Sequence, residues 1–191
     1  MTKVRLEAFS DGVIAILITI MVLELKVPHG EDWRSLATLA PQFLTYALSF
    51  VFLGIYWTNH HHMIQTVERV NGTILWANLH LLFWLSLVPF TTGWMGENHY
   101  APLPVALYGV VLLLAGIAYT LLQGAIIAYQ GPDSKLLAAV GGDRKGKFSL
   151  AGYAVAIALA YVVTPVSIAL YVLVALAWFV PDRRIESKLG G

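Results

Sequence analysis

Side chains that bind protons or ions lie inside long apolar segments of this sequence. Asp11 follows Ser10 near the start of the apolar run from Leu6 to Val27, which has about 22 residues and would form a helix of ~33 Å, long enough to cross a bilayer. A charge at the bilayer centre costs roughly 2.5–3.5 kcal/mol on insertion scales and less near the ends of a span. We therefore expect this segment to face protein or water rather than lipid.

Two further apolar segments carry amides and histidines. One ends with the run Asn-His-His-His at 59–62, and the next holds Asn78 and His80. If the first segment enters from the cytoplasmic side, the second returns to that side and the third starts there, so these groups share the cytoplasmic third of the membrane. A buried carboxylate needs hydrogen-bond donors. The predicted network consists of Arg5, Ser10, Asp11, Trp57, Asn59, His60, Trp76, Asn78 and His80. We favour a structural role for it, with a pH-responsive or gating element as the alternative.

Neither a metal site nor a catalytic motif is evident. Adjacent residues on a helix point about 100° apart, so the three consecutive histidines do not converge on one ion, and no His-x-x-x-His pair exists. Ser10 and Asp11 lack the nucleophile turn and the oxyanion donors of a hydrolase. The sequence has no cysteine, which excludes disulfides and thiol chemistry. We expect no enzyme, no structural metal and no cofactor. A net charge of +1 gives no reason to expect a nucleic-acid partner.

The elements that position these groups are predicted to be membrane-spanning helices. Of the 191 residues, 58% are hydrophobic and 12% are charged, against about 25% charged in soluble domains. Little polar sequence separates the apolar segments, so we expect an all-α membrane protein with a single transmembrane domain over residues 1–191. The six predicted helices cover residues 6–27, 35–62, 73–92, 103–129, 148–163 and 165–180.

The basic residues predict the orientation. With a cytoplasmic N-terminus, the inside segments hold Lys3, Arg5, Arg69, Lys135, Arg144, Lys145, Lys147, Arg183, Arg184 and Lys188. The outside segments hold only Lys26 and Arg34. By the positive-inside rule both termini are cytoplasmic, which also supports an even number of spans.

The first helix has a stripe of residues with helical spacing. At about 100° per residue, Gly12, Ile16, Thr19, Ile20 and Leu23 fall on one face, and Asp11 points nearly away from it. Periodicity alone favours ordinary packing between helices. The alternative is that the stripe faces its own symmetry copies around a central axis and lines a pore.

The spacing Arg5-x-x-x-Phe9-Ser10-Asp11, before an apolar helix that contains Thr19, resembles the signature of the transmembrane protein 175 family of endosomal and lysosomal potassium channels. The resemblance implies a one-repeat prokaryotic member with six helices, assembled as a homotetramer in the plasma membrane, with the first helix of each subunit lining the pore. It also implies that the signature residues, Phe9 included, form a site that hydrogen bonds hold to the neighbouring helices.

The same resemblance implies a constriction at Ile16, Thr19 and Leu23, with Ile20 on the same stripe. The filter sequence Thr-Val-Gly-Tyr-Gly is absent, so selection must occur along this helix. Rings of apolar side chains gate by narrowing or dewetting, and four Thr19 hydroxyls or carbonyls would coordinate a partly dehydrated potassium ion. We expect potassium as the permeant ion, with a modest preference over sodium.

Other classes of protein remain open at this point. A proton-coupled transporter would use Asp11 and His80 as a relay. A membrane enzyme and a scaffold without a pore are weaker alternatives.

Overall fold

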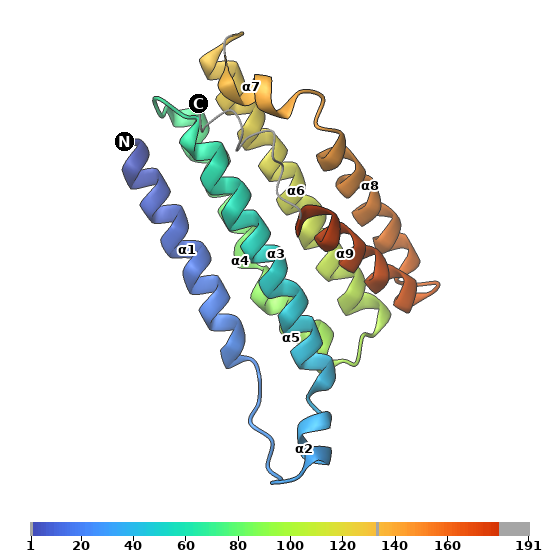
Figure 1. The fold of residues 1–191 in the computed structure, drawn as a ribbon. Helices are drawn as coiled ribbons and strands as arrows, with labels where there is room; N and C mark the ends of the chain where they lie inside the picture. The colour runs from blue at the N-terminus through green and yellow to red at the C-terminus, as the bar shows by residue number, and fades with distance from the viewer. Residues whose placement is uncertain (1, 133, 180–191) are drawn as a thin grey trace.

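The computed structural model describes residues 2–132 and 134–179, and these residues form helices joined by loops, without a strand (Figure 1). In chain order the helices are α1 (Lys3–Leu23), α2 (Trp33–Ala37), α3 (Ala40–Gln65), α4 (Gly72–Ser86), α5 (Val88–Glu97), α6 (Pro102–Gln130), α7 (Lys135–Val140), α8 (Arg144–Leu159) and α9 (Thr164–Phe179).

Four helical segments in the described part of the chain are long and apolar enough to cross a membrane. They are α1, α3, the pair α4–α5 and α6. Helices α8 and α9 have 16 residues each, or ~24 Å of helix against a hydrocarbon core of about 30 Å. The predicted all-helical membrane fold is therefore confirmed, whereas six crossings per subunit remain a prediction.

Two of the long helices have other bounds than the sequence suggested. α1 ends at Leu23 rather than at residue 27, because the exposed Glu24 caps it and the chain turns away toward Pro28. The predicted helix over 35–62 is split into α2 and α3. Pro41 is tolerated only in the first turn of a helix, where its missing N–H has no partner to lose, so α3 starts at Ala40.

Proline and capping residues set two further boundaries. The predicted helix over 73–92 is the pair α4–α5, which is interrupted at Leu87 because Pro89 donates no backbone hydrogen bond; the pair then runs on to Glu97. α8 begins before the predicted residue 148, because the carboxylate of Asp143 accepts a hydrogen bond from the Gly146 N–H at 3.0 Å and caps the helix. Residue 180, at the end of the last predicted helix, lies outside the described residues.

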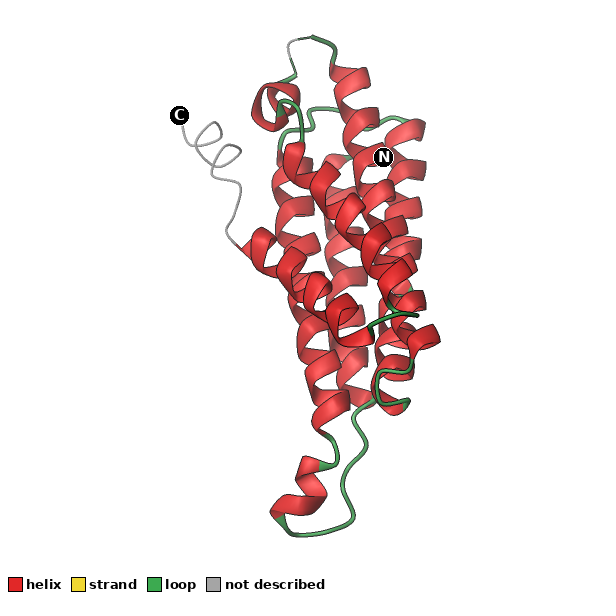
Figure 2. Ribbon diagram, turned by 90° about the vertical axis from the view of Figure 1, so that its right-hand side faces the viewer, coloured by secondary structure: helices red, strands yellow, loops and turns green. Residues whose placement is uncertain are grey.

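The long helices form a bundle in which α1 packs against α3 and the α4–α5 pair, and α6 packs against α4 and α5 (Figure 1). Helices α8 and α9 form an antiparallel hairpin on the α6 side of the bundle (Figures 1 and 2). At the end that carries α2, Lys26 Nζ lies 2.6 Å from Glu97 Oε1, and this contact raises the pKa of Lys26. Because both side chains are exposed, the pair adds little to stability.

Close packing holds the hairpin to the bundle. The Tyr171 hydroxyl donates to the Val105 carbonyl at 3.1 Å, and a Cβ atom at Gly109 would clash with that hydroxyl oxygen. Glycine is therefore required at position 109 for α9 to approach α6. Lipid tails are as apolar as the side chains, so such contacts and hydrogen bonds, rather than water exclusion, hold helices together in a membrane.

Candidate functional site

Helix α1 has one face inside the subunit and one face outside it. Its buried residues recur at helical spacing and are Leu6, Ser10, Ile14, Leu17 and Met21. On the other face the exposed fractions are 56% for Ile16, 40% for Ile20 and 78% for Leu23, and Gly12 and Thr19 are exposed as well. The stripe recognised in the sequence is therefore not covered by the described residues of its own subunit. It meets either lipid or another copy of the chain.

Thr19 is the only polar side chain on this exposed stripe. Its hydroxyl donates back to its own helix, to the Ile16 carbonyl at 2.9 Å and the Ala15 carbonyl at 3.1 Å. A hydroxyl that donates in this way keeps its oxygen lone pairs for another partner. The Thr19 oxygen can therefore accept a hydrogen bond or coordinate a cation without breaking the helix.

On the inner face a buried chain of hydrogen bonds joins three helices. The Ser10 hydroxyl donates to the Leu6 carbonyl at 2.9 Å and accepts from Asn78 Nδ2 at 2.9 Å. The other amide atom, Asn78 Oδ1, lies 2.7 Å from His60 Nε2. Since a carbonyl oxygen only accepts, His60 must carry its proton on Nε2. All three side chains have an exposed fraction of 0%. α1 is therefore tied to both α3 and α4 by groups that have no access to water.

A second set of contacts joins α1 to α3 alone. Three pairs of residues repeat every four positions along the two antiparallel helices. Lys3 Nζ donates to the Gln65 carbonyl at 2.8 Å, Glu7 Oε1 lies 3.2 Å from His61 Nδ1, and Trp57 Nε1 donates to Asp11 Oδ1 at 3.0 Å. We call these pairs the α1–α3 ladder.

The histidine of the ladder needs no positive charge to hold Glu7. Gln65 Nε2 lies 2.7 Å from His61 Nε2 and is a donor only, so His61 Nε2 accepts. The proton of neutral His61 then lies on Nδ1 and points to Glu7. Trp57, a member of the predicted network, is the hydrogen-bond donor to Asp11.

Other members of the predicted network lie apart from these two sets. His80 accepts from Trp84 Nε1 at 2.8 Å on its own helix, and Trp76 is 75% exposed. Both are two residues from Asn78 and therefore point to another side of α4. Asn59 Nδ2 donates to the Ile55 carbonyl on α3. The side chains of Arg5 and Phe9 are exposed and make no hydrogen bond with the described residues.

The network predicted from the sequence does not contain Lys3, Glu7, His61 or Gln65. A signal was present, because Lys3, Glu7 and Asp11 are spaced four apart and share a helix face. The predicted network consists of hydrogen-bond donors for Asp11, so it has no place for a second carboxylate, Glu7, and its partners.

Comparisons with known proteins identify the family. A family model described as the endosomal/lysosomal potassium channel TMEM175 matches residues 5–89, which include most of α1 and all of α3 and α4. A potassium channel of Chryseobacterium sp. (strain P1-3) is 56% identical over 189 residues, covering 99% of this chain and 98% of the relative. The chain belongs to the TMEM175 family.

A second sequence relative and a solved structure support the same family, and the solved structure also supports the fold. A potassium channel of Streptomyces collinus is 31% identical over 183 residues, covering 90% of this chain and 89% of the relative. The crystal structure of a lysosomal potassium-selective channel TMEM175 homolog from Chamaesiphon minutus superimposes with a TM-score of 0.82 at 28% identity, covering 94% of this chain and 97% of that chain. TMEM175 is a family of ion channels and not a class of enzyme. Apart from Lys3, the residues of the ladder and of the buried chain lie within residues 5–89 that the family model matches.

Proposed function

We propose that the chain forms a homotetrameric, potassium-permeable cation channel in which the α1 helices line a central pore. The observation that carries this proposal is the exposed stripe of α1. Ile16, Ile20 and Leu23 are apolar, uncovered within the subunit, and aligned with the hydroxyl of Thr19. The names of the relatives, potassium channels in two bacteria, support the permeant ion.

Conduction would depend on the alternation of apolar and polar rings along α1. Four copies of Ile16 or Leu23 would form constrictions that close by narrowing or dewetting. Between them, four Thr19 oxygens would replace part of the hydration shell of a potassium ion. Because an apolar ring discriminates weakly between monovalent cations, the preference for potassium over sodium would be modest and would depend mainly on Thr19.

The orientation in the plasma membrane follows from the distribution of basic residues. Lys3, Arg69 and Lys135 lie at the end of the bundle that carries α7, whereas Lys26 and Arg34 lie at the end that carries α2 (Figure 1). The positive-inside rule then puts the α7 end in the cytoplasm. Crossings by α8 and α9 would bring the C-terminus to the same side, for six spans in all.

A proton-coupled transporter based on Asp11 and His80 gains no support from the geometry. Asp11 is bonded to Trp57 on α3, whereas His80 is bonded to Trp84 on α4. A relay needs a continuous chain of groups that exchange protons, and an indole N–H only donates.

Single-channel recording of the purified chain in planar bilayers tests the proposed function. We expect discrete current steps in symmetric potassium chloride, and a reversal potential that follows the potassium gradient and not the chloride gradient. Without such steps at any membrane potential, or with a flux that requires a proton gradient, the chain is not a potassium channel. Leu17→Ala, on the buried face of α1, is a control that changes packing but leaves the exposed stripe unchanged.

A further inference from the structure

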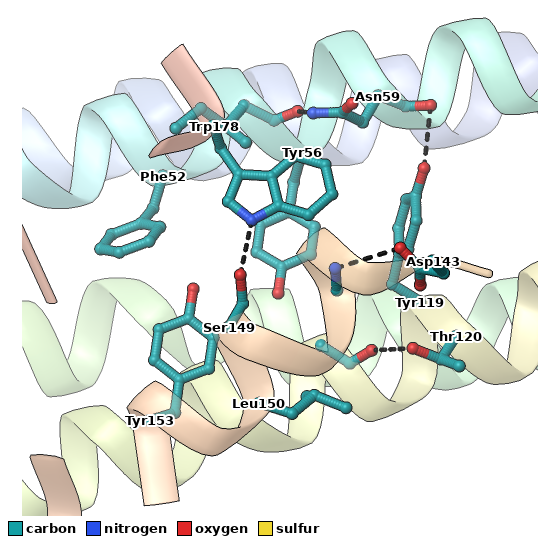
Figure 3. A pocket seen from close by; sticks show the side chains of 13 residues that line it. Phe52, Tyr56, Asn59, Tyr119, Thr120, Asp143, Ser149, Leu150, Tyr153 and Trp178 are labelled. Atoms are coloured by element: carbon teal, nitrogen blue, oxygen red, sulfur yellow. Dashed lines mark hydrogen bonds between the residues drawn. The ribbon is translucent and has the colours of Figure 1, made fainter. Parts of the chain in front are cut away.

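A small cavity lies between α3, α6, α8 and α9, on the side of α3 away from α1. Its volume is about 50 Å³, and its walls are mostly apolar and aromatic (Figure 3). Phe52 and Tyr56 come from α3, Tyr119 from α6, Tyr153 from α8 and Trp178 from α9. None of these residues belongs to the exposed stripe of α1 or to the ladder. The cavity is therefore separate from the proposed ion pathway.

Two hydroxyl groups in this cavity have no hydrogen-bond partner among the described residues. Tyr56 is 9% exposed and Tyr153 is 4% exposed, and both line the cavity (Figure 3). Their neighbours are bonded, since Trp178 Nε1 donates to Ser149 Oγ at 2.7 Å and the Tyr119 hydroxyl donates to the Asn59 carbonyl at 3.2 Å. Hydroxyl groups of such buried side chains usually have a hydrogen-bond partner, and both oxygens are open to the cavity, because neither is among the fully enclosed atoms without a partner. A molecule in the cavity would supply a hydrogen-bond partner for the hydroxyls of both Tyr56 and Tyr153.

The charged groups beside the cavity are already engaged. The carboxylate of Asp143 accepts from the Gly146 N–H at the start of α8, and Lys145 Nζ lies 4.6 Å from the centre of the Trp178 ring. An ion entering the cavity would lose its hydration without gaining a new opposite charge, which is costly in apolar surroundings. The lining therefore favours a neutral occupant.

We propose that this cavity is a binding site for a small neutral molecule with an apolar body and one hydrogen-bonding oxygen, such as a short-chain alcohol or ketone. The apolar part would lie against Phe52 and Leu150, and the oxygen would bond to the hydroxyls of Tyr56 and Tyr153. The volume of about 50 Å³ is the space open to the centre of a water molecule, and one water needs about 10–15 Å³ of such space. The cavity therefore admits a ligand of only a few heavy atoms.

Fluorine NMR of the full-length protein in detergent tests this site with two probes. Trifluoroethanol carries the hydroxyl, and trifluoropropane replaces it with a methyl group of similar size. We expect saturable binding of trifluoroethanol, with an affinity about five- to tenfold higher than that of trifluoropropane, the factor for one hydrogen bond. Equal affinities, or a signal that grows linearly as in simple partition into micelles, would overturn the proposal.

Variants locate the binding. Tyr56→Phe combined with Tyr153→Phe removes both hydroxyls at nearly constant volume, and the preference for trifluoroethanol should vanish. Gly116→Ala should weaken both probes, because the new Cβ atom would lie 2.8 Å from Leu150 Cδ2 and 3.7 Å from the Tyr56 hydroxyl oxygen. Tyr161→Phe, an exposed tyrosine outside the cavity, should change neither affinity. A preference that survives in the double variant places the probe elsewhere and refutes the site.

Discussion

Thr19 and Asp11 lie on the same helix and have opposite surroundings. Thr19 is exposed on the uncovered stripe, and its hydroxyl contacts only its own helix. Asp11 is held by an indole N–H of α3. Polar side chains in a membrane segment are costly, so each requires either a partner within the subunit or a partner outside it. Asp11 has a partner within the subunit, Trp57. We infer that the partner of Thr19 lies outside the subunit and is the permeant ion.

Thr19→Val tests this inference at the residue scale. Valine keeps the shape of threonine and removes the oxygen, so we expect the permeability ratio of potassium to sodium to fall about two- to tenfold, the range for one modest polar interaction. Reversal potentials under bi-ionic conditions measure the ratio. Thr58→Val is the matched control, since that hydroxyl also donates back to its own helix, to the Gly54 carbonyl at 2.9 Å, but lies on α3. An unchanged ratio in Thr19→Val would remove Thr19 from the selectivity mechanism.

At the scale of elements, α1 is fixed to its neighbours at one end of the bundle. The ladder and the buried chain through Ser10 and Asn78 all lie in the half of α1 that precedes Gly12. Beyond Gly12, its inward contacts are apolar, through Ile14, Leu17 and Met21. Polar bonds are directional and apolar contacts allow sliding, so we expect movements of α1 to occur mainly in its second half, which holds Ile16 to Leu23.

A double-mutant cycle tests the strength of this attachment. Trp57→Phe removes the donor to Asp11 and should destabilise the folded protein by about 0.5–1.5 kcal/mol, the net range for an intramolecular hydrogen bond, because Trp57 is 46% exposed. After Asp11→Leu, the same tryptophan change should cost much less, because the bond is already lost. Thermal unfolding in detergent, followed by circular dichroism, measures both. Trp84→Phe removes a similarly exposed bond, to His80, that lies within α4 and joins no two helices, so it is the control with a small effect. Additive effects of the Asp11 and Trp57 changes would show that the bond contributes little.

At the scale of the whole molecule, the isolated subunit leaves an apolar helix edge uncovered. Exposed apolar side chains are ordinary on a surface that faces lipid, but this edge also carries the hydroxyl of Thr19, and relatives of the chain are named potassium channels. A closed ring of subunits would bring the exposed stripes together around one axis, which a single chain cannot do.

Cross-linking tests this assembly in a chain that has no native cysteine. Leu23→Cys lies on the exposed stripe, and a bifunctional maleimide should join it to the same residue of another subunit, giving covalent dimers on a denaturing gel. Leu17→Cys, 7% exposed on the buried face, should give none. Native mass spectrometry of the unmodified protein should show four chains of 21.0 kDa. Dimers from Leu17→Cys alone, or a monomer mass, would contradict the central pore.

Composition and periodicity alone predicted an all-helical membrane protein, the first helix with its stripe, and the need for donors around Asp11. They could do so because the cost of polar groups in lipid and the helical repeat act on each segment by itself. The choice among donors could not be made this way. Asn59 and His60 are adjacent, as are His60 and His61, and only the rotation of α3 against α1 and α4 decided that His60 meets Asn78 while His61 meets Glu7. Such a rotation depends on packing between segments far apart in the chain, so the tertiary structure alone revealed the ladder and the two unpaired tyrosine hydroxyls.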